Sequence, residues 1–163
     1  MRSAILQREG LTMDVRQLQG QLRELQASMH QEGFIDDQFT QLQRLQDDSS
    51  PDFVKEVVTM YFDDSEKLID NMKKILTQAP VDFKQVDAYV HQYKGSSASV
   101  GAARIKNICM KFRNCCENQD HEGCWRLLQQ LQNEYNSLKG KLMYLFRLEQ
   151  ELRSAGGKIP SLE

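Results

Sequence analysis

Residues 91–97 read His-Gln-Tyr-Lys-Gly-Ser-Ser and lie in a longer segment whose apolar residues recur every three or four positions. This spacing predicts an amphipathic helix. The apolar face is expected to comprise Val86, Tyr89, Val90, Tyr93 and Val100. A second face carries Asp87, His91, Lys94, Gly95 and Ala98. An imidazole beside a cation and uncovered backbone favours an anion, and phosphoryl is the anion that a single histidine carries covalently.

Two interpretations of Gly95 follow from the local pattern. Lys94 followed by glycine is typical of a helix C-terminus, and Ser96 or Ser97 would then cap a new helix. Alternatively, the helix continues to about Ser99, although a glycine inside a helix costs about 1 kcal/mol relative to alanine. In the second case Gly95 removes a side chain that would shield the imidazole.

The same periodicity predicts helix nearly everywhere, and no segment alternates polar and apolar residues as a half-buried strand would. Two helices are expected at about 14–31 and 36–47. Four more should follow, with Ser50, Asp82 and Asp120 as N-caps of three of them and one starting near Ala102.

The last of these helices has a seam of apolar residues that alternate four and three positions apart, as in helix bundles and coiled coils. The seam consists of Cys124, Leu128, Leu131, Tyr135, Leu138, Leu142 and Leu145. Long helices with short links pack antiparallel. The sequence therefore predicts an all-α protein of about six helices, an antiparallel four-helix bundle with additional N-terminal helices covering one end.

The length of 163 residues favours one domain, expected at 13–153. Residues 1–12 are interpreted as an expression remnant or a disordered extension, and residues 154–163 as a flexible tail. The net charge of −2 gives no electrostatic reason to bind nucleic acid or an anionic membrane. Because the N-terminus lacks a signal-type apolar core, we expect an intracellular protein.

The four cysteines allow a metal site to be considered. Cys115, Cys116, His121 and Cys124 offer four soft ligands within ten positions. Adjacent cysteines on a helix point in different directions, however, and no Cys-x2-Cys pair occurs. The spacing favours small apolar helix residues over zinc ligands.

The residues from His91 to Ala102, with Arg104, Lys106, Asn107 and Cys109 beyond them, resemble the histidine-containing phosphotransfer (HPt) proteins, above all the plant members of the cytokinin phosphorelay. The resemblance extends from about Met13 to Leu152. It implies a four-helix bundle with extra N-terminal helices, in which the histidine-bearing helix continues through Gly95.

The resemblance also implies roles for single residues. His91 would be the phosphoacceptor, Lys94 would stabilise the phosphoryl group, and Gly95 would leave room for the partner. Gln92 and Ser96 would add polar contacts. Some plant relatives carry Asn or Gln in place of the histidine, so a chain with His91 should be competent.

The resemblance further implies partners and a setting. The partners would be receiver domains of hybrid sensor histidine kinases and of response regulators, and the setting would be the cytoplasm and nucleus. No cofactor is expected in this chain, because the partner's receiver domain supplies the magnesium.

Two further predictions concern the surroundings of His91. Counting about ten residues each way from a turn near Gly101 places residues 111–114 beside it, and Arg113 is the long cation there that lies off the apolar stripe. Arg113 would contact phosphoryl oxygens, or it is a solvated surface arginine. A docking surface is expected to include Ile35, Gln38, Phe39 and Leu42, although the core could claim any of them.

Two other classes of function are compatible with a helical chain. A histidine kinase dimerisation domain would require a following ATP-binding domain with glycine-rich boxes, and this sequence has none. A coiled-coil or helical scaffold would account for the seam of the last helix. A carrier accepts phosphate from a phosphorylated receiver domain, whereas a scaffold does not.

Overall fold

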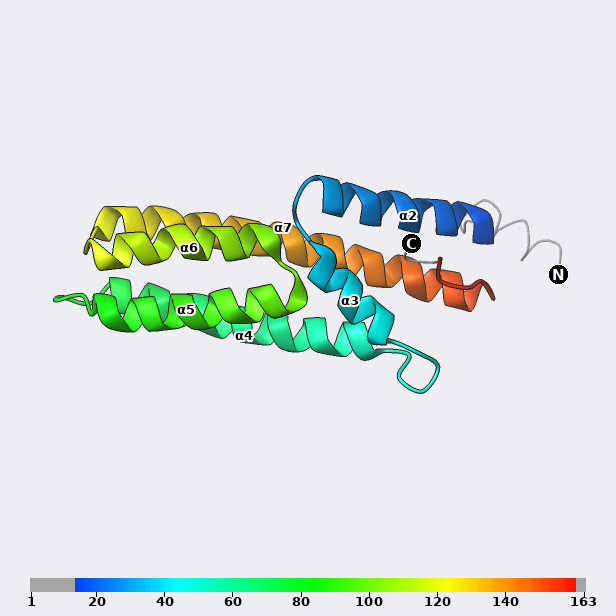
Figure 1. The fold of residues 1–163 in the computed structure, drawn as a ribbon, viewed down its shortest axis with the longest axis horizontal. Helices are drawn as coiled ribbons and strands as arrows, with labels where there is room; N and C mark the ends of the chain where they lie inside the picture. Colours follow the sequence, from blue (N-terminus) through cyan, green and yellow to red (C-terminus); the bar gives the residue numbers. More distant parts are fainter. Residues whose placement is uncertain (1–13, 161–163) are drawn as a thin grey trace. The chain divides into compact units, whose positions relative to one another are not determined.

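The computed structural model describes residues 14–160 and shows an all-α fold (Figure 1). The described helices are α2 (Val15–Gln31), α3 (Asp37–Leu45), α4 (Phe53–Leu76), α5 (Phe83–Val100), α6 (Ala103–Glu117) and α7 (His121–Ser154). The only β-type pairing within residues 14–160 is an isolated bridge between Asp47 and Ser50. No described helix combines the length and apolar character needed to span a bilayer. The predicted fold class is confirmed, and the prediction for residues 1–12 lies outside the described residues.

The chain divides into two compact units, of which residues 33–139 form the bundle unit. Here α5 packs against both α4 and α6. The first part of α7 joins them: the Tyr135 hydroxyl donates to the carbonyl of Phe62 on α4 at 3.2 Å, and Glu134 pairs with Arg104 of α6 at 2.7 Å. These four helices form the predicted bundle, and the short α5–α6 link makes those two antiparallel (Figure 1).

The turn between α5 and α6 also anchors α3. Gly101 ends α5 in the left-handed conformation with φ of 78°, which glycine adopts without strain. Its carbonyl accepts the amide of Asp36 at 3.0 Å, just before α3 begins. The helix that carries His91 therefore runs through Gly95 to Val100, as the resemblance implied, and the interpretation that it ends at Gly95 is wrong.

The buried face of α5 differs from the prediction at two positions. Val86, Val90, Tyr93 and Val100 are buried as expected, but Tyr89 is only half-buried. Ser97 is fully buried instead, with its hydroxyl 2.8 Å from the Tyr61 hydroxyl of α4. A small hydroxyl with a partner can occupy a core position, and a pattern of apolar residues cannot reveal it.

The caps follow the sequence at two of three helices. The Asp82 side chain accepts the Gln85 amide at 3.1 Å, and Asp120 accepts the Gly123 amide at 3.0 Å. Ser50 does not cap α4, which begins at Phe53. The Asp47 carboxylate accepts the amides of the next two serines and draws them into a turn, which delays the helix start.

The second unit contains residues 14–32 and 140–160. Asp14 caps α2 by accepting the Gln17 amide at 2.8 Å. Near the end of the chain, the Lys158 carbonyl accepts from the Gln19 side chain at 3.0 Å and Pro160 is buried. The predicted flexibility of residues 154–160 stays a prediction, and residues 161–163 lie outside the described part.

Glu149 of α7 gives a pH-dependent stability. Its burial raises the pKa of the carboxyl from 4.5 to about 6. Ionisation therefore disfavours the folded state, so this contribution is complete below pH 4.5 and is lost as pH rises through about 6. We expect Glu149→Gln to raise the free energy of unfolding by about 1–2 kcal/mol at roughly pH 7.5. Urea unfolding would measure it, and an equal gain at about pH 4 would contradict ionisation as the cause.

Candidate functional site

His91 lies in the middle of α5 on the face that points away from the core. Its side chain is exposed, whereas the nearby Tyr93 is fully buried. Asp87 lies one turn before His91 and Lys94 lies about one turn after it, and both are half-buried. The structure thus places on one face the imidazole and the cation that the sequence predicted there.

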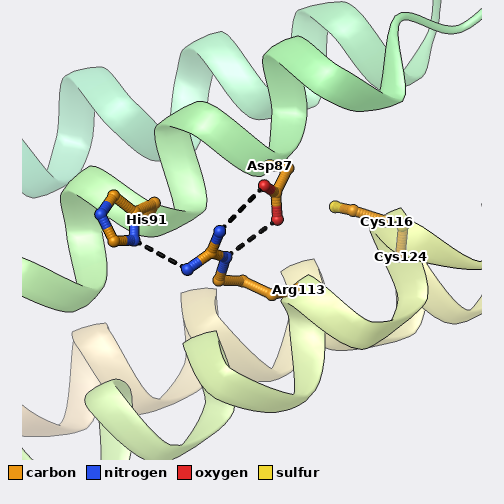
Figure 2. A network of polar contacts seen from close by, with 5 residues as sticks. All are labelled: Asp87, His91, Arg113, Cys116 and Cys124. Carbon is orange, nitrogen blue, oxygen red and sulfur yellow. Dashed lines mark hydrogen bonds and ion pairs between the residues drawn. The ribbon is translucent and has the colours of Figure 1, made fainter.

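Arg113 approaches this face from α6. Its Nη1 lies 2.8 Å from Nδ1 of His91, a contact across two antiparallel helices (Figure 2). The distance follows from the turn at Gly101, because residues at similar distances from a tight turn lie opposite each other. Counting from the turn therefore placed Arg113 beside His91 correctly. The Arg113 side chain contacts the imidazole and is not merely solvated, and its contact with phosphoryl oxygens stays a prediction.

Asp87 holds the Arg113 side chain in place. The carboxylate accepts from Arg113 Nε at 3.0 Å and from Nη2 at 3.2 Å, as Figure 2 shows. This two-pronged geometry is the strongest form of an arginine–carboxylate pair. The Asp87 carboxylate holds the pKa of the Arg113 guanidinium above its ordinary value. The sequence placed Asp87 on the His91 face but did not assign it this contact.

A cleft of about 350 Å³ opens beside His91. It is lined by Asp87, Lys94, Met110, Arg113, Asn114 and Glu117. Two cations that approach from α5 and α6 can bind the oxygens of an anion the size of a phosphoryl group. Met110 is 48% exposed and gives the cleft one apolar wall, which the sequence analysis did not predict.

The remaining predicted site residues of α5 take different positions. Gly95 is exposed, and a β-carbon built there would meet no atom within 4 Å, so the space over it is open. Gln92 is also exposed. The Ser96 hydroxyl donates to the Tyr93 carbonyl at 3.2 Å, so in this state it is turned towards its own helix.

The predicted docking residues separate into core and surface. Ile35 and Phe39 are 3% and 1% exposed, so the prediction that they contact a partner is corrected: both pack in the core of the bundle unit. Gln38 is exposed and Leu42 is half-buried, and these two stay a prediction. An apolar stripe on a short helix cannot distinguish a core contact from a partner contact.

The cysteines within residues 14–160 do not form a metal site. Within residues 14–160, no three His, Cys, Asp or Glu side chains are close enough to hold an ion. Cys116 and Cys124 lie buried with their sulfurs 4.0 Å apart, and the His121 ring contacts the Leu76 carbonyl at 2.8 Å instead. Burial raises the pKa of the Cys109 thiol to about 12, as expected for an unreactive core residue.

Known proteins resemble this chain in sequence and in fold. The sequence profile of the Hpt domain matches residues 56–141. The chain is 53% identical over 150 residues to histidine-containing phosphotransfer protein 2 of Arabidopsis thaliana. The aligned region covers 91% of this chain and 96% of that protein. Its fold matches the crystal structure of a histidine-containing phosphotransfer protein from Medicago truncatula with a TM-score of 0.82 and 63% identity, over 86% of this chain and 96% of the other.

A maize histidine-containing phosphotransfer protein also matches, with a TM-score of 0.79 and 46% identity, over 83% of this chain and 99% of the other. The matched profile covers more than half of the sequence, and the relatives are covered almost completely. The chain belongs to the histidine-containing phosphotransfer family.

Proposed function

We propose that this protein accepts a phosphoryl group on His91 from the receiver domain of a hybrid sensor histidine kinase and passes it to an aspartate of a response regulator. Membership in the family supports the coarser role, that of a phosphorelay intermediate in two-component signalling. The observation that carries the proposal is the exposed His91 imidazole in contact with Arg113 and one turn from Lys94.

The chemistry requires little from this chain beyond a nucleophile and positive charge. An imidazole nitrogen gives its lone pair to the phosphorus of an aspartyl phosphate, and the P–O bond to the partner's carboxylate breaks. The carboxylate leaves with that electron pair, and the other ring nitrogen keeps its proton. Lys94 and Arg113 bind the phosphoryl oxygens. The partner's receiver domain supplies the magnesium, so we propose no metal or cofactor of this chain's own.

The proposal extends to partners and setting. Because the residues around His91 resemble those of plant cytokinin phosphorelay proteins, we place the chain in cytokinin signalling, in the cytoplasm and nucleus. The receiver domain would cover the cleft beside His91 and reach towards α3, where Gln38 is exposed and Leu42 is half-buried. Met110 offers it an apolar contact next to the phosphoryl site.

Incubation with a receiver domain that carries a labelled aspartyl phosphate tests the proposal. We expect label to move to this protein in an acid-labile form and then on to a second receiver domain. ATP alone should leave the chain unlabelled, because the sequence has no glycine-rich phosphate-binding loop. Labelling by ATP without a kinase, or no labelling from the receiver domain, would contradict the carrier function.

Gly95→Gln is expected to fold normally and to slow phosphoryl transfer at least about tenfold, which corresponds to roughly 1.4 kcal/mol. The helix has open space at this position, so the new side chain fits, but it covers the approach to His91. Transfer rates from a labelled receiver domain would measure the effect. Gly140→Gln is the matched control, because Gly140 is also exposed, helical and uncrowded. Equal rates for both variants would mean that no partner approaches closely over Gly95.

A further inference from the structure

The contact with Arg113 determines where the His91 ring carries its proton. A guanidinium group has only hydrogen-bond donors, so Nδ1 at 2.8 Å from Nη1 must accept. In a neutral imidazole the proton then lies on Nε2. The single lone pair of the ring is therefore engaged by Arg113, and Nε2 has none to offer. In this state neither nitrogen is ready to attack phosphorus.

Asp87 directs Arg113 into that contact. The carboxylate binds Nε and Nη2, which fixes the guanidinium plane and leaves Nη1 pointing at the imidazole (Figure 2). Asp87 and His91 are four residues apart on α5, so both acceptors belong to one rigid helix face. Three nitrogens of the Arg113 side chain thus donate to acceptor atoms of two neighbouring residues.

We propose that Asp87 is a positioning residue that acts through Arg113 to keep resting His91 in the Nε2–H tautomer, without a free lone pair. This inference rests on the proposed function and deepens it. When an aspartyl phosphate arrives, its oxygens compete for Nη1. Arg113 Nη1 can then donate to a phosphoryl oxygen in place of His91 Nδ1, while the two hydrogen bonds from Nε and Nη2 to Asp87 stay in place.

The exchange frees the lone pair when the phosphoryl group is present. Nδ1 can then attack directly, or Nε2 can attack after the ring proton has moved to Nδ1 through solvent. In either case the new N–P bond forms as the P–O bond to the partner's carboxylate breaks, and that electron pair leaves with the carboxylate. The ring nitrogen that does not attack carries the proton, so no further reagent is needed.

Nitrogen NMR of the histidine rings tests the tautomer directly. In the unmodified chain at a pH where His91 is neutral, Nδ1 should give the signal of an unprotonated nitrogen and Nε2 that of a protonated one. In Asp87→Asn both signals should move towards the average of the two tautomers, because an amide gives the guanidinium only one acceptor. Arg113→Gln should move them in the same direction.

Two controls separate positioning from general destabilisation. The His121 signals in the same spectrum should stay in place, because that ring contacts the Leu76 carbonyl and Trp125. Glu134→Gln breaks an ion pair of similar exposure, Arg104–Glu134 at 2.7 Å, and should leave the His91 signals unchanged. Unshifted His91 signals in both Asp87→Asn and Arg113→Gln would overturn the proposal.

Label transfer gives the second readout. Asp87→Asn should accept phosphoryl groups faster than the unmodified chain, by up to about tenfold, because the lone pair is less often engaged. Slower acceptance by this variant would overturn the proposed release step. If no form of the chain accepts label while the nitrogen signals still shift as expected, the proposed function fails and the positioning role of Asp87 stands.

Discussion

His91→Gln is expected to abolish phosphoryl acceptance and to leave the fold intact. Glutamine has no nucleophilic nitrogen, so the loss should be complete within detection. The His91 side chain is exposed and contacts Arg113, so its replacement should change the free energy of unfolding by no more than about 0.5 kcal/mol.

Transfer of label from a phosphorylated receiver domain would measure phosphoryl acceptance, and urea unfolding would measure the free energy of unfolding. His30→Gln serves as a control, because His30 belongs to α2 and not to the bundle unit. It should accept label at the rate of the unmodified chain. If His91→Gln were labelled to the normal level, the acceptor would be a different residue.

Gly101→Ala should lower the free energy of unfolding by about 2–4 kcal/mol. Its φ of 78° is strained for any residue with a β-carbon. That β-carbon would also lie 2.5 Å from the Phe39 amide nitrogen and 2.7 Å from Asp36 Oδ1, so the start of α3 would have to move. Urea midpoints would measure the loss, and near-normal stability would show that the α5–α6 turn adapts without cost.

Gly95→Ala is the matched comparison within the same helix. Gly95 has helical backbone and open space, so alanine should be neutral or stabilise by up to about 1 kcal/mol. A large loss at Gly95 would mean that the middle of α5 needs glycine for its backbone, and its role in access would lose support.

The course of α5 shows what local sequence can and cannot decide. Asp82 could be predicted as the N-cap of α5, because a capping side chain and the amide that it accepts are close in sequence. The end was ambiguous, because Lys94 followed by Gly95 has the composition of a helix terminus. The helix continues because its next turn buries Ser97 and Val100 in the core, and tertiary packing outweighs a glycine's modest cost. The local pattern left both interpretations open, and the family resemblance decided for the continuing helix.

The site was predicted in part for a similar reason. Arg113 could be found because a tight turn relates the residues on either side of it. The two-pronged ion pair between Asp87 and Arg113 could not be predicted, because helix periodicity shows on which face a side chain lies but not which partner it binds. Ile35 and Phe39 were misassigned because apolar spacing is the same for a core face and a binding face. Ser50 was misassigned because Asp47 competes for the nearby amides.

The hydroxyl contact between Tyr61 and Ser97 has a consequence for the direction in which His91 points. Turning α5 by one residue, about 100°, would carry His91 away from Arg113 and would also break this buried contact. Each hydroxyl left buried without a partner would cost about 1–3 kcal/mol. A contact between two residues that touch no phosphate thus fixes the angle of the helix about its own axis. Substitutions at Tyr61 or Ser97 can therefore misdirect the imidazole without altering any residue of the cleft.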